Sequence, residues 1–265
     1  MGNLFSNQTE IPWLNSYEKS WKKITQNNKT PHAILISGNR GIGKRAFAAW
    51  LATEHLNIKT KYEGCIYPYA VPSHADLKWI SPNEGKRDIS VDQIRQIIDD
   101  LTMSSYEGIG KVTVIEPVNK MNISSANSLL KILEEPPGNT LIILIADKMK
   151  NIPATITSRC QHIKIYPPTE DESREFINHI HPDANIGKID PYILVSPLIY
   201  EEQNNHSQNI ESIINDLMGM LNKKNSPLDI AARLSVEEAE IFLDWFSYFV
   251  YSLLRSAHKV NKQQS

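Results

Sequence analysis

The sequence predicts an α/β protein with a parallel sheet, because short apolar runs alternate with helical patterns through the first 165 residues. Each run is bounded by turn residues, is rich in β-branched residues and is too short for a typical helix, so we expect buried strands. The predicted strands are Ala33–Ser37, Val112–Glu116, Leu141–Ala146 and Ile163–Ile165. Strands that alternate with helices in this way form a parallel sheet with helices on both of its faces.

Helical signals lie between these runs. Ala46–His55 is a helical stretch that follows the first strand. Ser90–Gln93 is a capping box, in which the serine hydroxyl and the glutamine side chain satisfy free amides at a helix N-terminus. Apolar residues then recur at helical spacing as far as Leu101. A further helix, near Ser125–Glu134, must end before Pro136–Gly138, which cannot continue it.

After Tyr166–Pro168 the strand signal fades and the chain is predicted to be helical. Helices are expected over Glu170–His179 and Asn204–Leu221. The strongest pattern is a wide apolar and aromatic stripe, which must be buried against another surface. The residues of the stripe are Ile241, Phe242, Trp245, Phe246, Phe249, Val250, Leu253 and Leu254.

Composition and charge limit the possible functions. Of the 265 residues, 41% are hydrophobic and 22% are charged, which is an ordinary globular composition and excludes wholesale disorder. With 28 Lys+Arg against 30 Asp+Glu the net charge is −2, so the basic excess typical of a freestanding nucleic-acid binder is missing. The sequence contains no apolar stretch long enough for a membrane span and no signal-peptide core, and we expect a cytoplasmic protein.

A glycine-rich loop follows the first predicted strand. Gly38, Gly41, Gly43 and Lys44 keep the G-x4-G-K spacing of a phosphate-binding loop between a strand and a helix. Glycines let backbone amides converge on a phosphate, while the lysine and the helix N-terminus supply positive potential. Arg45, however, replaces the Ser or Thr whose hydroxyl would bind Mg²⁺. We interpret the segment as a degenerate P-loop, with a purely structural turn or a passive nucleotide site as the alternatives.

The second half of an ATPase site is altered as well. The strand over residues 111–115 ends in Glu116, which can take the place of a metal-binding acid. Pro117 stands where a water-activating glutamate would follow, and its side chain has no ionisable group. The sequence therefore predicts a nucleotide-binding fold without hydrolytic activity. The alternative is an active ATPase that holds its metal through unusual ligands.

Two further motifs point to a particular protein family. Asn127–Pro137 contains the run LLKILEEPP and follows the altered acidic motif, and Ser158–Cys160 forms the run SRC further along the chain. Together with the P-loop remnant, and in this order, they resemble the AAA+ clamp-loader family over residues from about Trp13 to Thr169. The resemblance implies a RecA-like AAA+ domain over residues 1–165, a small helical lid over residues 166–205 and a short all-α collar for oligomerisation over residues 206–265.

The resemblance also implies roles for the SRC motif. Arg159 would act in trans as an arginine finger on the γ-phosphate of ATP held by a neighbouring subunit, with Ser158 supporting the turn. The subunit that the chain resembles is the stator of the clamp loader, which belongs to the DNA polymerase III holoenzyme and hydrolyses no ATP itself. The implied partners are motor subunits of the gamma and tau type, a delta-type clamp-opening subunit and, through the assembled complex, the sliding clamp and primer-template DNA.

Several features of the family are missing. Ala146 and Asp147 occupy the position of a sensor threonine, and Val195–Leu198 contains no sensor arginine. Of the four-cysteine zinc module that is common in the family only Cys65 is present, and Cys65 with His74 cannot close a tetrahedral site. We therefore expect this chain to hold neither a metal nor a cofactor. A DNA-binding module that acts alone is a further hypothesis, and the net charge argues against it.

Overall fold

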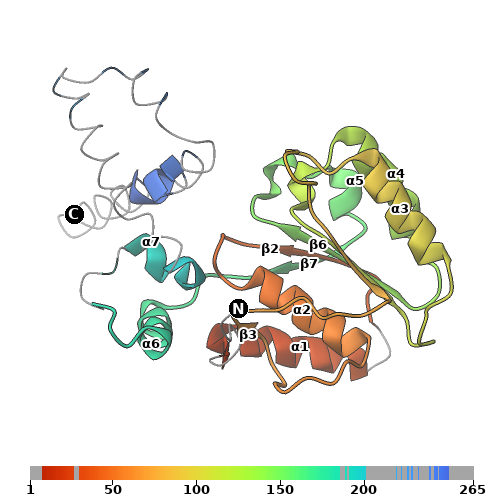
Figure 1. Cartoon of the computed structure of the whole chain (residues 1–265), viewed down its shortest axis with the longest axis horizontal. Coiled ribbons are helices and arrows are strands. Elements are labelled where there is room, and N and C mark those ends of the chain that lie inside the picture. The colour runs from red at the N-terminus through yellow and green to blue at the C-terminus, as the bar shows by residue number, and fades with distance from the viewer. Residues whose placement is uncertain are drawn as a thin grey trace, which may run out of the picture.

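The protein consists of an α/β unit with a smaller helical part beside it (Figure 1). The computed structural model describes residues 8–26, 30–185, 189, 191–200, 242–243 and 245–250, together with the single positions 219, 222, 226, 228, 232 and 239. None of the described helices combines the length and the apolarity needed to cross a bilayer.

Five parallel strands form the central sheet in the order β4-β5-β6-β2-β7. Their bounds are Ala33–Ser37 (β2), Leu77–Ile80 (β4), Lys111–Ile115 (β5), Thr140–Ala146 (β6) and Gln161–Lys164 (β7). The parallel sheet and all four predicted strands are confirmed, although Glu116 lies just beyond β5 and Ile165 just beyond β7. The edge strand β4 was not predicted, because the exposed Lys78 interrupts its short apolar run.

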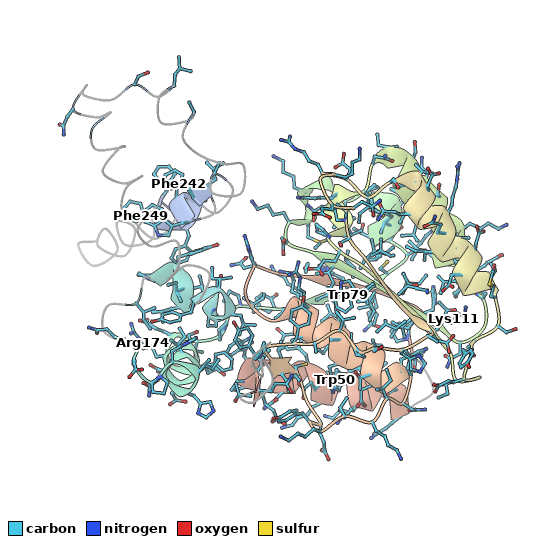
Figure 2. All side chains as sticks on the ribbon, in the orientation of Figure 1. Trp50, Trp79, Lys111, Arg174, Phe242 and Phe249 are labelled. Carbon is cyan, nitrogen blue, oxygen red and sulfur yellow. The ribbon has the colours of Figure 1, made fainter. Side chains whose placement is uncertain are left out.

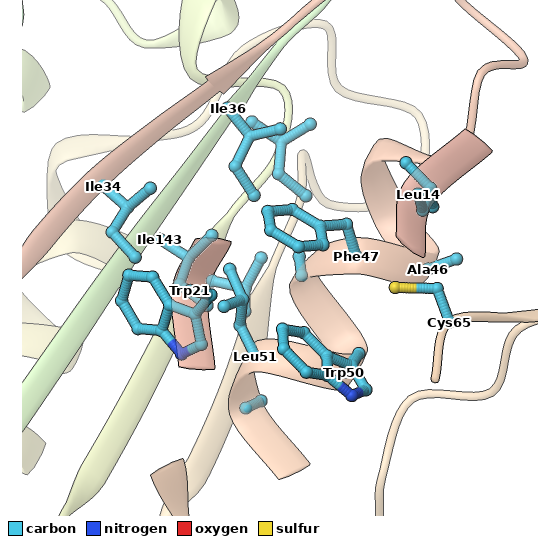
Figure 3. Close-up of a cluster of buried hydrophobic side chains, with 14 of the residues drawn as sticks. Leu14, Trp21, Ile34, Ile36, Ala46, Phe47, Trp50, Leu51, Cys65 and Ile143 are labelled. Atoms are coloured by element: carbon cyan, nitrogen blue, oxygen red, sulfur yellow. The ribbon is translucent and has the colours of Figure 1, made fainter. Parts of the chain in front are cut away.

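The two faces of the sheet carry separate cores, as the alternation of side chains along a strand requires. Ile34 and Ile36 of β2 lie in one core, while Ala33 and Leu35 lie in the other. Every residue of β2 is buried, which is why the strand appears in the sequence as a continuous apolar run. Figure 3 shows the first core, where Phe47 packs among residues from several elements.

Helices cover both faces of the sheet, as predicted (Figure 1). One face is covered by α1 (Asn15–Gln26) and α2 (Lys44–His55), and the other by α3 (Val91–Thr102), α4 (Ile123–Glu134) and the single turn α5 (Ala154–Thr157). Short 3-10 turns connect the elements at Pro12–Leu14 (η1), Val118–Lys120 (η2) and Met149–Asn151 (η3). A two-stranded antiparallel ribbon joins β1 (Thr9–Glu10) to β3 (Ile66–Tyr67).

The helices begin where side chains cap their free amides. The Ser90 hydroxyl accepts the backbone N–H of Gln93 at 3.2 Å, and the Gln93 side chain accepts the N–H of Ser90 at 3.1 Å, so the predicted capping box of α3 is confirmed. Helix α4 begins two residues before the predicted start, because Asn122 is its N-cap and accepts the N–H of Ser125 at 2.8 Å.

A small helical part follows the sheet. It contains α6 (Glu170–Ile180), α7 (Pro191–Leu194) and the turn η5 (Pro197–Ile199). Phe176 of α6 meets Trp13 edge-on, with ring centroids 4.9 Å apart, so α6 packs against the α/β unit. The predicted helix over Asn204–Leu221 and most of the predicted collar lie outside the described residues.

The aromatic stripe near the C-terminus is described in part. Trp245 is only 7% exposed, because it packs against Tyr192 and Ile199 of the small helical part. Phe249 stacks on Trp245 and stays 42% exposed, and its position beside Phe242 can be followed in Figure 2. The described part of the stripe is therefore buried only at Trp245, not along its whole width as predicted.

The capping box of α3 gives the first testable prediction. Replacing Ser90 with alanine leaves the Gln93 amide without its acceptor, and we expect the free energy of unfolding to fall by about 1 kcal/mol. Urea unfolding followed by circular dichroism measures the change. Ser104→Ala, in the exposed loop after α3, is the control and should leave stability unchanged. Equal effects of the two substitutions would contradict the assigned role of the cap.

Candidate functional site

The glycine-rich loop, residues 38–43, connects β2 to α2 at the carboxyl edge of the sheet, where the sequence places it. Gly41 and Gly43 have positive φ angles of 73° and 95°. A Cβ atom at Gly41 would lie 2.6 Å from Cγ2 of Ile199, and one at Gly43 would lie 2.9 Å from Cδ1 of Leu14. Packing against Ile199 and the positive φ angle favour glycine at Gly41, and the positive φ angle favours it at Gly43, whether or not a phosphate is bound.

A cleft of about 630 Å³ opens in front of this loop. Its charged lining residues are Arg40, Lys44, Arg45, Lys120, Lys148, Glu116 and Asp147. Gly41, Gly43, Lys44 and Glu116 thus lie together, as the interpretation as a degenerate P-loop requires. Cations outnumber carboxylates among these residues, so the cleft favours an anionic ligand on balance.

The ammonium group of Lys44 already contacts three oxygen atoms of its own chain. Its Nζ donates to the carbonyls of Gly38 at 2.9 Å and Asn39 at 2.6 Å, and forms an ion pair with Oδ1 of Asp147 at 2.6 Å. The lysine is almost fully buried, and this burial lowers its pKa even though Asp147 opposes the shift. The three contacts match the three N–H donors of an ammonium group.

Arg45 pairs with the acid that would otherwise hold a metal. Its Nε–H donates to Oε1 of Glu116 in a short contact, and Glu116 is only 7% exposed. Burial disfavours the charge of Arg45, but the adjacent Glu116 carboxylate outweighs this effect and the pKa of Arg45 is raised. A guanidinium thus lies between the loop and the acidic strand end, where a P-loop ATPase would place Mg²⁺.

The second oxygen of Glu116 is also occupied. Trp79 of β4, labelled in Figure 2, donates its indole N–H to Oε2 of Glu116 at 3.1 Å. Tyr69 stacks on Trp79 with ring centroids 6.3 Å apart. Burial raises the pKa of Tyr69 although Arg45 opposes the shift, so the hydroxyl is neutral at pH 7. Sequence reasoning missed Trp79, because β4 was not recognised, and it treated Asp147 as a lost sensor and not as a partner of Lys44.

The SRC motif lies apart from the cleft, between α5 and β7. Arg159 donates from Nε to Oε1 of Glu134 at 2.7 Å and from Nη1 to the carbonyl of Thr155 at 2.9 Å. Its side chain remains 34% exposed. Ser158 Oγ lies 3.3 Å from Nη1 of Arg159 and 3.3 Å from the carbonyl oxygen of Thr155.

The two cysteines are enclosed by apolar neighbours. Cys160 packs at the edge of the core that contains α3 and α4, and burial raises the pKa of its thiol to about 12. Cys65 is buried in the other core (Figure 3), where its backbone N–H donates to Oε1 of Glu18 at 2.7 Å. Across the part of the chain that the structure describes, no group of three or more His, Cys, Asp or Glu side chains could hold a metal ion.

The pair of Arg45 with Glu116 generates a stability prediction. Arg45→Met leaves a buried carboxylate without its counter-charge, and we expect the free energy of unfolding to fall by about 1–3 kcal/mol, with part of the loss recovered in Arg45→Met/Glu116→Gln. Chemical denaturation of the isolated chain measures both effects. Arg95→Met, which breaks an exposed pair with Asp92, is the control and should cost less than about 0.5 kcal/mol. Equal losses at Arg45 and Arg95 would show that the pair with the buried Glu116 adds no more stability than an exposed pair.

Cys160 generates a prediction about pH. Its thiol is held neutral in the folded chain up to a pKa of about 12, against 9.0 for an ordinary cysteine. Its contribution to stability is therefore complete below pH 9 and is lost as the pH rises from 9 toward 12. We expect the free energy of unfolding to fall more steeply above pH 9 in the natural chain than in Cys160→Ala. Parallel curves for the two proteins would refute the burial effect at this thiol.

Comparisons with known proteins place the chain in a family. The family model described as "DNA polymerase III, delta subunit" matches residues 13–169, which is more than half of the chain. A Pseudomonas aeruginosa protein named DNA polymerase III subunit delta' is 27% identical over 257 residues, covering 92% of this chain and 77% of that relative. A protein of Buchnera aphidicola subsp. Schizaphis graminum named DNA polymerase III subunit gamma is 33% identical over 157 residues, covering 57% of this chain and 43% of that relative.

A structural comparison supports the fold. A solved structure of Thermotoga maritima RuvB superimposes with a TM-score of 0.52 at 14% identity, covering 78% of this chain and 64% of that chain. The RecA-like α/β fold that the motifs implied is confirmed. With the match over residues 13–169, the chain belongs to the DNA polymerase III delta-subunit family of AAA+ clamp-loader proteins.

Proposed function

We propose that this chain is a delta'-type stator subunit of the DNA polymerase III clamp loader, and that it donates Arg159 in trans to a neighbouring ATPase subunit while the sliding clamp is loaded. The observation that carries the proposal is a contrast between two sites. Lys44 and Arg45 of the cleft are paired with Asp147 and with the buried Glu116, the acid that would hold a metal, whereas Arg159 lies outside the cleft and pairs with Glu134, whose side chain is 50% exposed.

The paired cleft supports a chain that hydrolyses no ATP. A Mg²⁺ complex of ATP would have to separate Arg45 from Glu116 to gain its acidic ligand, and Lys44 from Asp147 to gain its phosphate contact. Pro117 then offers no base for the attacking water. We therefore propose that no nucleotide is consumed here, that no zinc is held, and that ATP is bound by the neighbouring subunit.

The chemistry of Arg159 suits a role in trans. A guanidinium keeps its charge at any physiological pH and offers fixed donors to the oxygens of a phosphoryl group, on which charge spreads during transfer. Arg159 projects from the short connection between α5 and β7, which fixes its backbone to the sheet. An arginine placed in this way can act on a nucleotide held by another chain.

The proposed partners follow from the names of the relatives. Proteins named as delta' and gamma subunits of DNA polymerase III resemble this chain. We propose that the chain assembles with motor subunits of the gamma and tau type and with a delta-type clamp-opening subunit, in the cytoplasm. Its net charge of −2 favours contact with primer-template DNA only through the assembled complex.

Arg159→Ala tests the proposal directly. In a complex reconstituted with its motor and clamp-opening subunits, we expect the DNA-stimulated ATPase rate at the adjacent site to fall by about 10³-fold while the complex still assembles. The isolated chain should hydrolyse no ATP. An unchanged rate in Arg159→Ala would overturn the finger assignment, and hydrolysis by the isolated chain that disappears in Lys44→Ala would show an active ATPase instead.

A further inference from the structure

We propose that Glu134 is a positioning residue for Arg159, which holds one edge of the guanidinium so that the opposite edge faces a phosphate. The proposal rests on the proposed function of Arg159 and adds a second residue to it. Glu134 is the last residue of α4 and belongs to the LEEPP run, whereas Arg159 belongs to the SRC run 25 positions further along the chain. The ion pair therefore connects the two motifs that identify the family.

The contacts of Arg159 are divided between its two edges. Nε donates to Oε1 of Glu134 at 2.7 Å, and Nη2 makes a short contact with the same oxygen, so Glu134 occupies the Nε–Nη2 edge. Nη1 donates to the carbonyl of Thr155 at 2.9 Å. An arginine side chain has five N–H donors in a planar fork. Nη1 also donates to Oγ of Ser158 in a longer contact of 3.3 Å, so among the described residues only one N–H of Nη2 has no acceptor. Nη1 and Nη2 together form the second edge.

The edge formed by Nη1 and Nη2 has the right chemistry for a phosphate once the contact with Ser158 is exchanged. Two parallel N–H donors match two oxygens of a phosphoryl group in a bidentate contact. Arg159 is 34% exposed and Glu134 is 50% exposed, so the pair lies at the surface of the chain. The longer 3.3 Å contact from Nη1 to Ser158 Oγ is the weakest of the set and can be replaced by a phosphate oxygen.

Two physical effects favour this arrangement. An unrestrained arginine loses much rotamer freedom when it engages a ligand, and a side chain that is already held loses less. The carboxylate of Glu134 lies at the C-terminal end of α4, where the helix dipole disfavours a negative charge, so the guanidinium stabilises that helix end. The contact is therefore favourable before any partner binds, and it orders the finger in advance.

The experiment uses the reconstituted complex and compares Glu134→Gln, Glu134→Ala, Arg159→Ala and the double variant Glu134→Ala/Arg159→Ala. We expect kcat of the adjacent ATPase site to fall about threefold to tenfold in Glu134→Ala. The fall should be smaller in Glu134→Gln, because glutamine keeps an acceptor oxygen. KM for ATP should be unchanged in both variants. The double variant should be no slower than Arg159→Ala alone. Glu170→Ala is the matched control for Glu134→Ala, because it removes a similarly exposed partner from Arg174 on α6, and it should leave kcat unchanged.

Each outcome decides between the proposals. If kcat falls in Arg159→Ala but keeps its wild-type value in both Glu134 variants, the positioning role of Glu134 is overturned and the role of Arg159 as the arginine finger stands. A faster Glu134→Ala would show that the carboxylate restrains the finger, and effects that multiply in the double variant would show that Glu134 acts independently of Arg159. Natural rates in Arg159→Ala would refute the proposed function itself. Thermal unfolding of each isolated variant identifies loss of fold, in which case the nearly isosteric Glu134→Gln decides.

Discussion

The parallel register of the sheet is the constraint on which the remaining structure depends. Because β2 lies between β6 and β7, and β5 lies beside β6, the carboxyl ends of these strands meet at one edge. The residues that follow them are the phosphate loop after β2, Glu116 after β5 and Asp147 after β6. Charged side chains are therefore brought to short range at this edge, where Lys44 pairs with Asp147 and Arg45 pairs with Glu116.

The two arginines of the candidate sites show how burial separates their roles. Arg45 bonds to a carboxylate that is almost fully enclosed and has its second oxygen bound by Trp79, so releasing the guanidinium would leave a buried charge uncompensated. Arg159 bonds to Glu134 at the surface, where solvent weakens the ion pair. Both guanidinium groups are partly exposed, and the two pairs differ in the carboxylate, which is buried at Glu116 and half-exposed at Glu134.

Much of the fold and part of the site could be predicted from the sequence. Buried strands such as β2 are visible as apolar runs, the capping box at Ser90 is local, and the glycine spacing indicates the loop. The edge strand β4 escaped prediction, because one exposed lysine interrupts its pattern, and Trp79 was missed with it. The contact of Glu134 with Arg159 depends on the packing of α5 against α4, which sequence spacing does not specify.

Gly41 lies against Ile199 at the junction between the phosphate loop and the small helical part. The backbone N–H of Leu198 donates to the carbonyl of Gly41 at 3.0 Å, beside the collision that a Cβ atom at this position would cause. A substitution at Gly41 would therefore disturb the junction between the sheet and the small helical part even in a chain that never meets a nucleotide. The glycine spacing of a phosphate loop can thus be required for packing alone. Its presence in a sequence therefore does not show that the site binds or hydrolyses a nucleotide.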